Sequence, residues 1–468
     1  MTIWSTALKV LEKGAVAIIG PQSSTIAHMI SHISGGLQVP LVSFAATDPT
    51  LSSLEYPFFI RMTQSDSYQM RAMADLVNHY GWRQVIAVYV DDDYGRNGIY
   101  SLDDELANKM SSLYKIALPV GATQDYMMSM LKKSQMIGPR VYVVHANPDS
   151  GLEIFSVAQQ LHMMTDEYAW LATDWLCTAL DTSETTVHKS LNYLQGVVGF
   201  CKYVPQSSQK NVLLSKWREL QGKGVVTSKL NAYGFYAYDT VWAVAHAINN
   251  FLNESGNITF TSKNNLVNMK GKMQLDKLKT FDGGHHLLQK LLLLNFTGLT
   301  SQVQFDSDQN LKSDTYQIAN IDGPMVRPVG FWANNSGLSV HLPKTSYGNE
   351  QRNSSFNQQL GNITWPGGRT KTPRGWVVAT KEKPLRIVVP YRTSYVEFVT
   401  AVQDNHTAKG YCVDVFEASI KLVPYDVPHQ FVPFGDGHSN PNYFKLVNMV
   451  SDKVNVHHQL FLGPNIQL

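Results

Sequence analysis

The sequence has little charge and almost no cysteine. Charged side chains make up 16% of its 468 residues and the net charge is +2, so the basic surface that nucleic-acid-binding proteins need is not expected. The three cysteines, Cys177, Cys201 and Cys412, are too few for a disulfide-rich scaffold. Cys177 and Cys201 could pair, and the sequence leaves this open. An apolar fraction of 44% excludes an intrinsically disordered chain.

Long hydrophobic runs are also missing. A membrane-spanning helix needs about 18 or more consecutive apolar residues, and the densest stretch, 287–294, is interrupted by Gln289 and Lys290. The first twenty residues have no basic segment followed by an unbroken apolar one, so no signal peptide is predicted.

Catalytic and metal-binding motifs are not found either. No G-x-S-x-G, P-loop or G-x-G-x-x-G follows a predicted strand. His28 and His32 have the i, i+4 spacing of metal ligands, but the glutamate that a zincin places directly after its first histidine is a methionine here. We therefore expect no enzyme, no metal site and no cofactor.

The sequence does contain short apolar runs that alternate with segments of helical periodicity. This pattern predicts an α/β fold with a parallel sheet covered by helices on both faces. The predicted helix over 235–252 has five residues spaced to face a core: Tyr238, Val241, Val244, Ala245 and Ile248. The predicted strands are 15–20, 39–44, 85–90, 140–145 and 168–173, and the predicted helices are 25–33, 68–80, 99–110, 151–161 and 235–252.

The composition changes near residue 345. Residues 345–375 are polar, contain glycine and proline, and predict a linker between domains. A second α/β unit begins near Trp376, with a strand at 385–391, a helix at 413–422 and a loop-rich segment at 423–442. Only about 90 residues remain for it, which is short for a complete domain.

Polar residues follow four of the predicted strands, where an open α/β sheet binds its ligands. Ser23 and Ser24 stand at the start of a helix, where hydroxyls either cap the helix or contribute to an anion site. Thr47 follows the second strand. Tyr94 lies in an acidic turn and could offer its ring to a cation. Asp174 could accept hydrogen bonds from an ammonium group or cap a helix.

Four segments resemble the plant glutamate-receptor-like channels, which belong to the ionotropic glutamate receptor family. GPQSSTIAHMISHISGGLQVPLVSFAATDPTLSSLEYPFFIRMTQSDSYQMRAMADLV and AYGFYAYDTVWAVAHAI are similar to their amino-terminal domain. PLRIVVPYRTSYVEFV and GYCVDVFEASIKLVPYDVPHQFVPFGDGHSNPNYFKLV are similar to the first segment of their second, amino-acid-binding domain. The resemblance implies a bilobed type I periplasmic-binding-like domain of the Leu/Ile/Val-binding type, followed by an incomplete type II segment.

The resemblance also implies a function. Family members are tetrameric, ligand-gated cation channels, so it implies a receptor that takes part in ion transport and signal transduction at the cell membrane. By similarity to metabotropic glutamate receptors, Ser23, Ser24 and Thr47 would hold the carboxylate of an amino acid, while Tyr94 and Asp174 would hold its ammonium group. The ligand could be a neutral amino acid, another small molecule or nothing, in which case the domain would serve assembly alone. A soluble amino-acid-binding protein of the periplasmic type is the alternative function.

Seven Asn-X-Ser/Thr sequons lie in the second half of the chain, and the resemblance would place them outside the cytosol as glycosylation sites. Ordinary Asn-rich loops are the other explanation. The sequons begin at Asn253, Asn257, Asn295, Asn334, Asn353, Asn362 and Asn405.

Compared with the family, the chain is expected to lack a signal peptide, the first strand of the first lobe and the pore helices. The expected organisation is a bilobed domain over 1–344, a linker over 345–375, a partial second ligand-binding domain over 376–453 and a divergent tail without a core pattern over 454–468.

Overall fold

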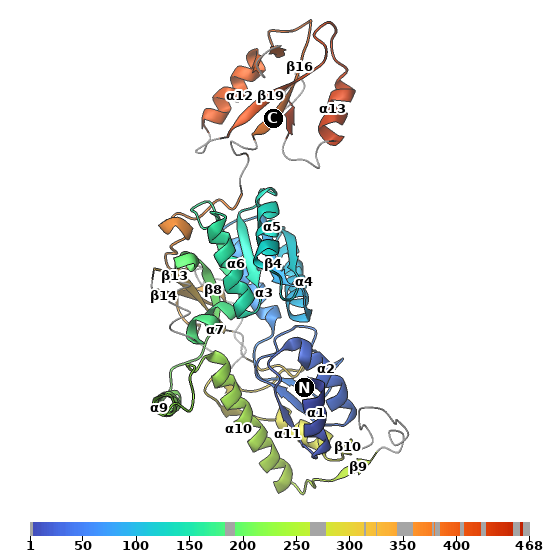
Figure 1. Ribbon diagram of the computed structural model, residues 1–468, viewed down its shortest axis with the longest axis vertical. Helices are drawn as coiled ribbons and strands as arrows, with labels where there is room; N and C mark the ends of the chain where they lie inside the picture. Colours follow the sequence, from blue (N-terminus) through green and yellow to red (C-terminus); the bar gives the residue numbers. More distant parts are fainter. Residues whose placement is uncertain are drawn as a thin grey trace. The chain divides into compact units, whose positions relative to one another are not determined.

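The computed structural model describes residues 3–182, 192–262, 278–312, 315–323, 325–343, 359–376, Ala379, 384–402, 407–422, 427–452 and 459–461. The chain forms two compact units (Figure 1). The first consists of Met1–Lys132 and Arg140–Gly375, and the second of Lys133–Pro139 and Trp376–Leu468. The first unit has two lobes, each with its own sheet (Figure 1).

The first lobe contains a sheet of three parallel strands in the order β1-β2-β3. Apolar side chains of helices and strands form its core, including Val42, Ile60, Tyr236 and Leu287. Its elements are β1 (Ile18–Ile19), β2 (Leu41–Ser43), β3 (Phe59–Arg61), α1 (Ile3–Glu12), α2 (Ser24–Gly36), α10 (Ala232–Asn253), α11 (Gly284–Leu292), and the hairpins β9 (Phe260–Ser262) with β10 (Lys279–Phe281) and β11 (Phe296–Thr297) with β12 (Gln302–Val303).

The second lobe contains an eight-stranded sheet in the order β15-β14-β13-β8-β7-β6-β4-β5. Its strands are β4 (Gln84–Val90), β5 (Ser112–Leu118), β6 (Val141–His145), β7 (Ala169–Ala172), β8 (Val198–Lys202), β13 (Thr315–Asp322), β14 (Met325–Ala333) and β15 (Gly337–Ser339). Its helices are α3 (Asp66–His79), α4 (Asp93–Ala107), α5 (Gln124–Gln135), α6 (Pro148–Gln160) and α7 (Trp175–Thr182), and α9 (Ser208–Gly222) precedes α10 in the chain.

Strand β4 explains why helices cover both faces of this sheet. Its side chains alternate, so that Val85 and Ala87 join the core beneath α3 and α4, while Ile86 and Val88 join the core beneath α5 and α6. A strand buried on both faces is apolar throughout, as the run at 85–90 is. The predicted α/β class with a type I periplasmic-binding-like domain is confirmed.

The sheet differs from the prediction in one respect, since it is mixed rather than purely parallel. Strands β4 to β8 are parallel, whereas β13, β14 and β15 run antiparallel at one side. Hairpin-linked strands such as β13 and β14 need only a short turn and no crossover helix. They therefore leave no strand–helix alternation in the sequence.

The buried face of α10 also differs from the prediction. Tyr238, Val241 and Ala245 are exposed, and of the five expected core positions only Val244 is fully buried. The helix instead buries Asp239, whose carboxylate accepts hydrogen bonds from the backbone of Leu299 and Thr300, both at 2.8 Å. A polar residue that is satisfied in this way can occupy a core position, which a purely apolar pattern misses.

Part of the predicted linker packs on the first unit. Ile363 and Trp365 are buried in the core beneath α3 and α4. The indole N–H of Trp82 donates to the Pro373 carbonyl at 2.9 Å, and the rings of Trp82 and Trp365 lie 5.6 Å apart edge to face. Residues 359–375 thus belong to the first unit. The isolated apolar residues among polar ones gave no periodic signal in the sequence.

In the second unit, β16 (Leu385–Pro390) lies between β19 (His429–Phe434) and β20 (Gln459–Phe461), with which it pairs in parallel. The unit also contains the hairpin β17 (Thr400–Val402) with β18 (Thr407–Lys409) and the helices α12 (Tyr411–Leu422) and α13 (Tyr443–Asp452). Two of these strands lie in segments expected to have none: β19 in the loop-rich segment and β20 in the tail. Strand pairing through backbone groups can form without a long apolar run.

No helix in the described part of the chain combines the length and the hydropathy that crossing a bilayer requires.

Candidate functional site

The start of α2 carries the two predicted serines. Ser23 is the N-cap residue, but its side chain is exposed and makes no capping hydrogen bond. Ser24 is buried, and its hydroxyl accepts a hydrogen bond from the backbone of Asp48 at 3.3 Å. The Ser23 side chain therefore does not cap the helix, which was the alternative to a ligand site.

Thr47 lies four residues beyond the end of β2, in the first lobe, and contacts the second lobe directly. Its hydroxyl donates to the Asp66 carboxylate at 2.7 Å, and both side chains are buried. Asp66 is the first residue of α3, so its carboxylate is stabilised by the positive end of the helix. Asp66 gives no signal of a site in the sequence, because an acidic residue in the first helical turn has an ordinary structural role.

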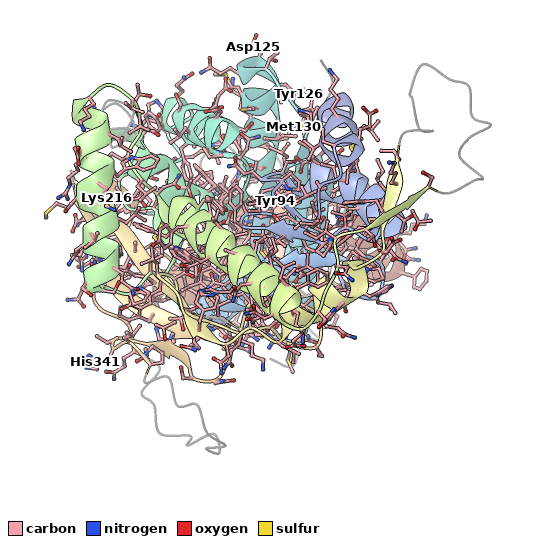
Figure 2. The ribbon with its side chains drawn as sticks, turned by 90° about the horizontal axis from the view of Figure 1, so that it is seen from below. Tyr94, Asp125, Tyr126, Met130, Lys216 and His341 are labelled. Carbon is pink, nitrogen blue, oxygen red and sulfur yellow. A yellow bond between two sulfur atoms is a disulfide. The ribbon has the colours of Figure 1, made fainter. Side chains whose placement is uncertain are left out.

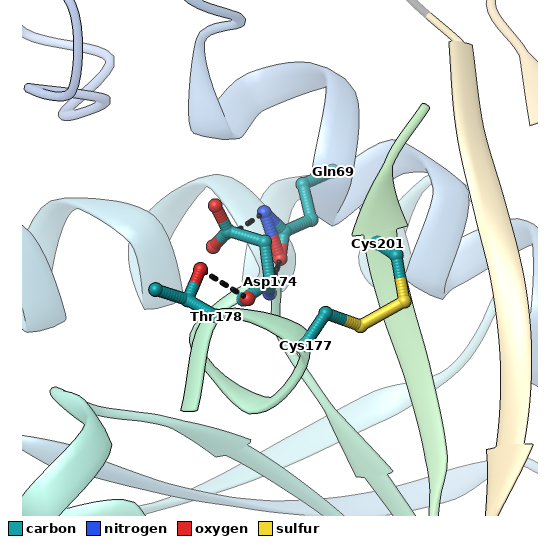
Figure 3. Close-up of a disulfide and its surroundings, with 5 residues drawn as sticks. All are labelled: Gln69, Asp174, Cys177, Thr178 and Cys201. Carbon is teal, nitrogen blue, oxygen red and sulfur yellow. Dashed lines mark hydrogen bonds between the residues drawn. A yellow bond between two sulfur atoms is a disulfide. The ribbon is translucent and has the colours of Figure 1, made fainter. Parts of the chain in front are cut away.

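Asp174 follows β7 and is held by two hydrogen-bond donors and an ion pair. Tyr233 at the start of α10 donates to Oδ2 at 2.9 Å, and the Lys202 ammonium lies 3.2 Å from the same oxygen. Gln69 of α3 donates to Oδ1 at 3.3 Å and accepts from the Asp174 backbone at 2.8 Å (Figure 3). Gln69 also lies 3.5 Å from Asp66, and thus connects the two carboxylates.

A disulfide lies beside this aspartate. Cys177 on α7 is bonded to Cys201 on β8 (Figure 3). Asp174 precedes Cys177 by three residues and Lys202 directly follows Cys201, so the disulfide joins the two segments that carry this ion pair. The pairing that the sequence left open is therefore present, and Cys412 is free.

Tyr94 lies in the first turn of α4, which begins at Asp93 rather than near Ile99 as predicted. Asp92 caps the helix by accepting from the Gly95 backbone at 2.8 Å, so the acidic turn is a helix start. The Tyr94 ring packs on His145, with ring centroids 4.1 Å apart. In Figure 2 it lies near the centre of the view, whereas Lys216 and His341 lie near the edge.

We call the group formed by Thr47, Asp66, Gln69, Tyr94, His145, Asp174, Lys202 and Tyr233 the buried polar cluster. Burial and the nearby Asp174 charge raise the pKa of Asp66 from 3.8 to about 7, against the opposing effect of Lys202. Burial lowers the pKa of His145 to about 4, so this imidazole is neutral at physiological pH although it lies 3.9 Å from Asp66. Burial and the Asp66 and Asp174 charges raise the pKa of Tyr94 well above 10.

Two polar groups at this cluster have no hydrogen-bond partner in the described part of the chain. These are the ammonium of Lys202, apart from its ion pair, and the hydroxyl of Tyr316. Both residues are more than nine-tenths buried, and they are paired across β8 and β13. Buried donors without acceptors are costly, and they are common where a ligand or water completes the structure.

The two lobes also touch beside the cluster. Asp48 of the first lobe accepts a hydrogen bond from His28 at 2.8 Å and one from Asn97 of α4 at 2.9 Å. Burial would raise the pKa of Asp48, but the hydrogen bonds from His28, Asn97 and Thr50 hold it below its usual value. His28 also lies 3.0 Å from the Tyr56 hydroxyl, so both of its ring nitrogens have protein partners.

The structure thus brings four of the five predicted residues to one region. Thr47, Tyr94 and Asp174 belong to the cluster, and Ser24 bonds the residue after Thr47. The side chain of Ser23 is exposed. Five further cluster members, which were not predicted from the sequence, come from α3, β6, β8 and α10: Asp66, Gln69, His145, Lys202 and Tyr233. A polar residue inside an otherwise apolar strand, as at His145 and Lys202, is the signal that could have found two of them.

Comparison with known proteins agrees with this architecture. Residues 5–323 match the family described as receptor family ligand binding region. Glutamate receptor 3.7 of Arabidopsis thaliana is 49% identical over 451 residues, covering 96% of this chain and 48% of the relative. Glutamate receptor 3.4 of the same plant is 47% identical, covering 96% of this chain and 47% of the relative. Glutamate receptor 3.1 of Oryza sativa subsp. japonica is 46% identical, with coverages of 95% and 48%.

The chain spans about half the length of these curated relatives. The match to the family covers most of the first unit, and the similarity to the relatives extends into the second. The chain belongs to the receptor ligand-binding family and is a plant glutamate-receptor-like protein with an amino-terminal domain of the Leu/Ile/Val-binding type.

Proposed function

We propose that this chain is the extracellular ligand-sensing and assembly portion of a glutamate-receptor-like, ligand-gated cation channel, which acts as a homo- or heterotetramer at the cell membrane and has no enzymatic role. The observation that carries the proposal is the buried polar cluster between two lobes that touch each other. Closure of two lobes around a ligand is a common way to turn binding into a mechanical signal. The similarity to plant glutamate receptors supports the channel as its setting.

The ligand of the first unit is an α-amino acid in this proposal. Its carboxylate would lie at the start of α2, where free backbone N–H groups, Ser23, Ser24 and Thr47 offer donors. Its ammonium group would lie near the carboxylates of Asp66 and Asp174, beside the ring of Tyr94. Burial of these charges on lobe closure strengthens their attraction, because the effective dielectric constant falls.

Calorimetric titration of the chain with each of the twenty amino acids tests this proposal. We expect a saturable heat for at least one of them, and the heat should decrease strongly in a Thr47→Val/Asp66→Asn double variant that retains the wild-type circular dichroism. If the folded protein gives no heat with any amino acid, amino-acid sensing by the first unit is wrong, and assembly is the role that remains.

Glycosylation of the sequons is a second expectation, and the Cys177–Cys201 disulfide supports it, because such bonds persist outside the cytosol. Asn253, Asn257, Asn295 and Asn362 are exposed. Asn334 is half-buried, and its side chain accepts a hydrogen bond from Arg71 at 2.8 Å. Asn353 and Asn405 lie outside the described residues.

Expression of the chain behind a secretion signal in eukaryotic cells tests this expectation. Asn→Gln variants at the four exposed sequons should each remove one step of the mobility shift that an endoglycosidase reverses. The Asn334 variant should change mobility less, since that side chain is half-buried and also accepts the hydrogen bond from Arg71. An enzyme-treated chain that migrates like the untreated one would contradict the prediction.

A further inference from the structure

We propose that the Lys202–Asp174 ion pair makes the first unit selective for amino acids whose side chain carries no negative charge. This inference rests on the proposed amino-acid site and names the class of its ligand. It starts from the charges that the buried polar cluster contains before any ligand arrives. These charges determine which further charges the site accepts.

The cluster contains two carboxylates and one ammonium group. His145 contributes no charge, because burial keeps its pKa near 4. Lys202 lies 3.2 Å from Asp174, with side-chain exposures of 2% and 3%. Asp174 also accepts hydrogen bonds from Tyr233 and Gln69, so its oxygens are largely occupied.

Asp66 is the carboxylate with acceptor capacity left. Its Oδ2 accepts from Thr47 at 2.7 Å, whereas its Oδ1 has only the long contact with Gln69 at 3.5 Å. Once Lys202 neutralises Asp174, the cluster carries a single negative charge when Asp66 is ionised. The ammonium group of one amino acid balances that charge, while the helix start and the hydroxyls receive the α-carboxylate.

A second carboxylate on the ligand would need a further cation. The basic residues described as buried in the first unit all have partners. Arg61 donates to the carbonyls of Ala46, Asp48 and Leu51 and to the side chain of Asn310. Lys210 donates to the Val204 carbonyl, and Arg140 lies over the Tyr168 ring.

The backbone keeps Lys202 in this place. Residue 202 is paired with Tyr316 across β8 and β13, and its neighbour Cys201 is tied to Cys177, three residues from Asp174. The positive charge of Lys202 is therefore already balanced by Asp174. A ligand carboxylate that draws the ammonium away leaves Asp174 unpaired in the interior, and one that shares the ammonium adds a negative charge that no cation balances. Removing one partner of a buried ion pair is strongly unfavourable.

The test compares L-glutamine with L-glutamate, which have nearly the same shape and differ in one negative charge. In calorimetry at pH 8 with the whole chain, L-glutamate should bind on the order of 100-fold more weakly than L-glutamine. If L-glutamate binds as tightly as L-glutamine or more tightly, the inference is overturned while the amino-acid site stands. If neither these two nor any other amino acid binds, the proposed function is overturned as well.

Two variants test the role of the ion pair itself. Asp174→Asn keeps an acceptor for Tyr233 but releases Lys202, so the preference for L-glutamine should shrink by at least tenfold. Lys202→Met leaves a second unbalanced carboxylate, and L-lysine should gain at least tenfold relative to L-glutamine. Lys210→Met removes a buried lysine on α9 that lies outside the cluster, and it should leave both ratios unchanged. If Asp174→Asn or Lys202→Met retains the wild-type circular dichroism and its ratio of affinities is unchanged, the inference is overturned.

Discussion

Replacing Asp66 with asparagine is expected to weaken amino-acid binding by about 100-fold, because the ligand ammonium would lose its charged partner in a buried site. Asparagine is nearly the same size and can still accept the hydrogen bond from Thr47. A loss of affinity would therefore report the missing charge and not a cavity. Calorimetry measures the effect. The matched control is Asp103→Asn on the exposed surface of α4, where the carboxylate pairs with Lys115 and no change is expected.

The same residue predicts a pH dependence. The pKa of Asp66 is raised to about 7, first by burial and then by the Asp174 charge. An ammonium group binds the ionised carboxylate, so affinity should fall about tenfold for each pH unit below 7 and level off above it. Binding near pH 7 should also release protons, which titrations in buffers of different ionisation enthalpy detect. In Asp66→Asn both effects should vanish, and their persistence would contradict this role.

The free energy of unfolding should depend on pH in the opposite direction to the ligand affinity. The unfolded chain releases the Asp66 proton near pH 3.8, whereas the folded protein keeps it up to about pH 7. The folded state therefore binds more protons between these values, and the free energy of unfolding contributed by this group decreases as the pH rises from about 4 to about 7. Ligand binding at pH 8 offsets that decrease, because the ammonium group replaces the proton as the partner of the carboxylate.

Removal of the disulfide is expected to lower the free energy of unfolding of the first unit by about 3 kcal/mol. Cys177 and Cys201 are 24 residues apart, and opening a loop of that size gives the unfolded chain this much conformational entropy. Chemical unfolding of a Cys177→Ser/Cys201→Ser variant, compared with wild type, measures the change. Cys412→Ser, which removes the free cysteine, should leave the unfolding midpoint of the first unit unchanged.

The disulfide variant should also affect binding, since the bond joins the segments that carry Asp174 and Lys202. We expect a weaker affinity for L-glutamine and a smaller discrimination against L-glutamate, because the ion pair is no longer held from both sides. Reduction of the wild-type protein with dithiothreitol should reproduce both changes. A variant that loses stability but keeps the discrimination would show that the bond has only a structural role.

Much of the fold could be predicted because long elements carry their own periodicity. The helix predicted over 68–80 is α3, and the strand predicted over 85–90 is β4. Strands β19 and β20 could not be predicted in this way, since Pro433 interrupts the pattern in β19 and β20 has only three residues. Their pairing with β16 forms them. The buried face of α10 was misassigned because the polar residues Asp239 and Thr240 lie on it and have hydrogen-bond partners there, backbone and hydroxyl donors for Asp239 and the Tyr236 carbonyl for Thr240.

The candidate site could be predicted only where a polar residue follows a strand. Ser24, Thr47, Tyr94 and Asp174 were selected in this way and lie in or beside the buried polar cluster. Asp66 and Lys202 were missed, because an acid in the first turn of a helix and a lysine in a strand are ordinary on a protein surface. Their burial depends on how the two lobes meet.

The sequence by itself determined the α/β alternation and the kinship with plant glutamate receptors, because both depend on residues that are close together in the chain. Only the tertiary structure decided which charges share the interior. Asp66 precedes both Asp174 and Lys202 by more than a hundred residues in the chain, and the folding of the chain into two lobes brings the three together. Burial then raises the energy of each unpaired charge, so the pairing of Lys202 with Asp174 and the elevated pKa of Asp66 are properties of the folded chain.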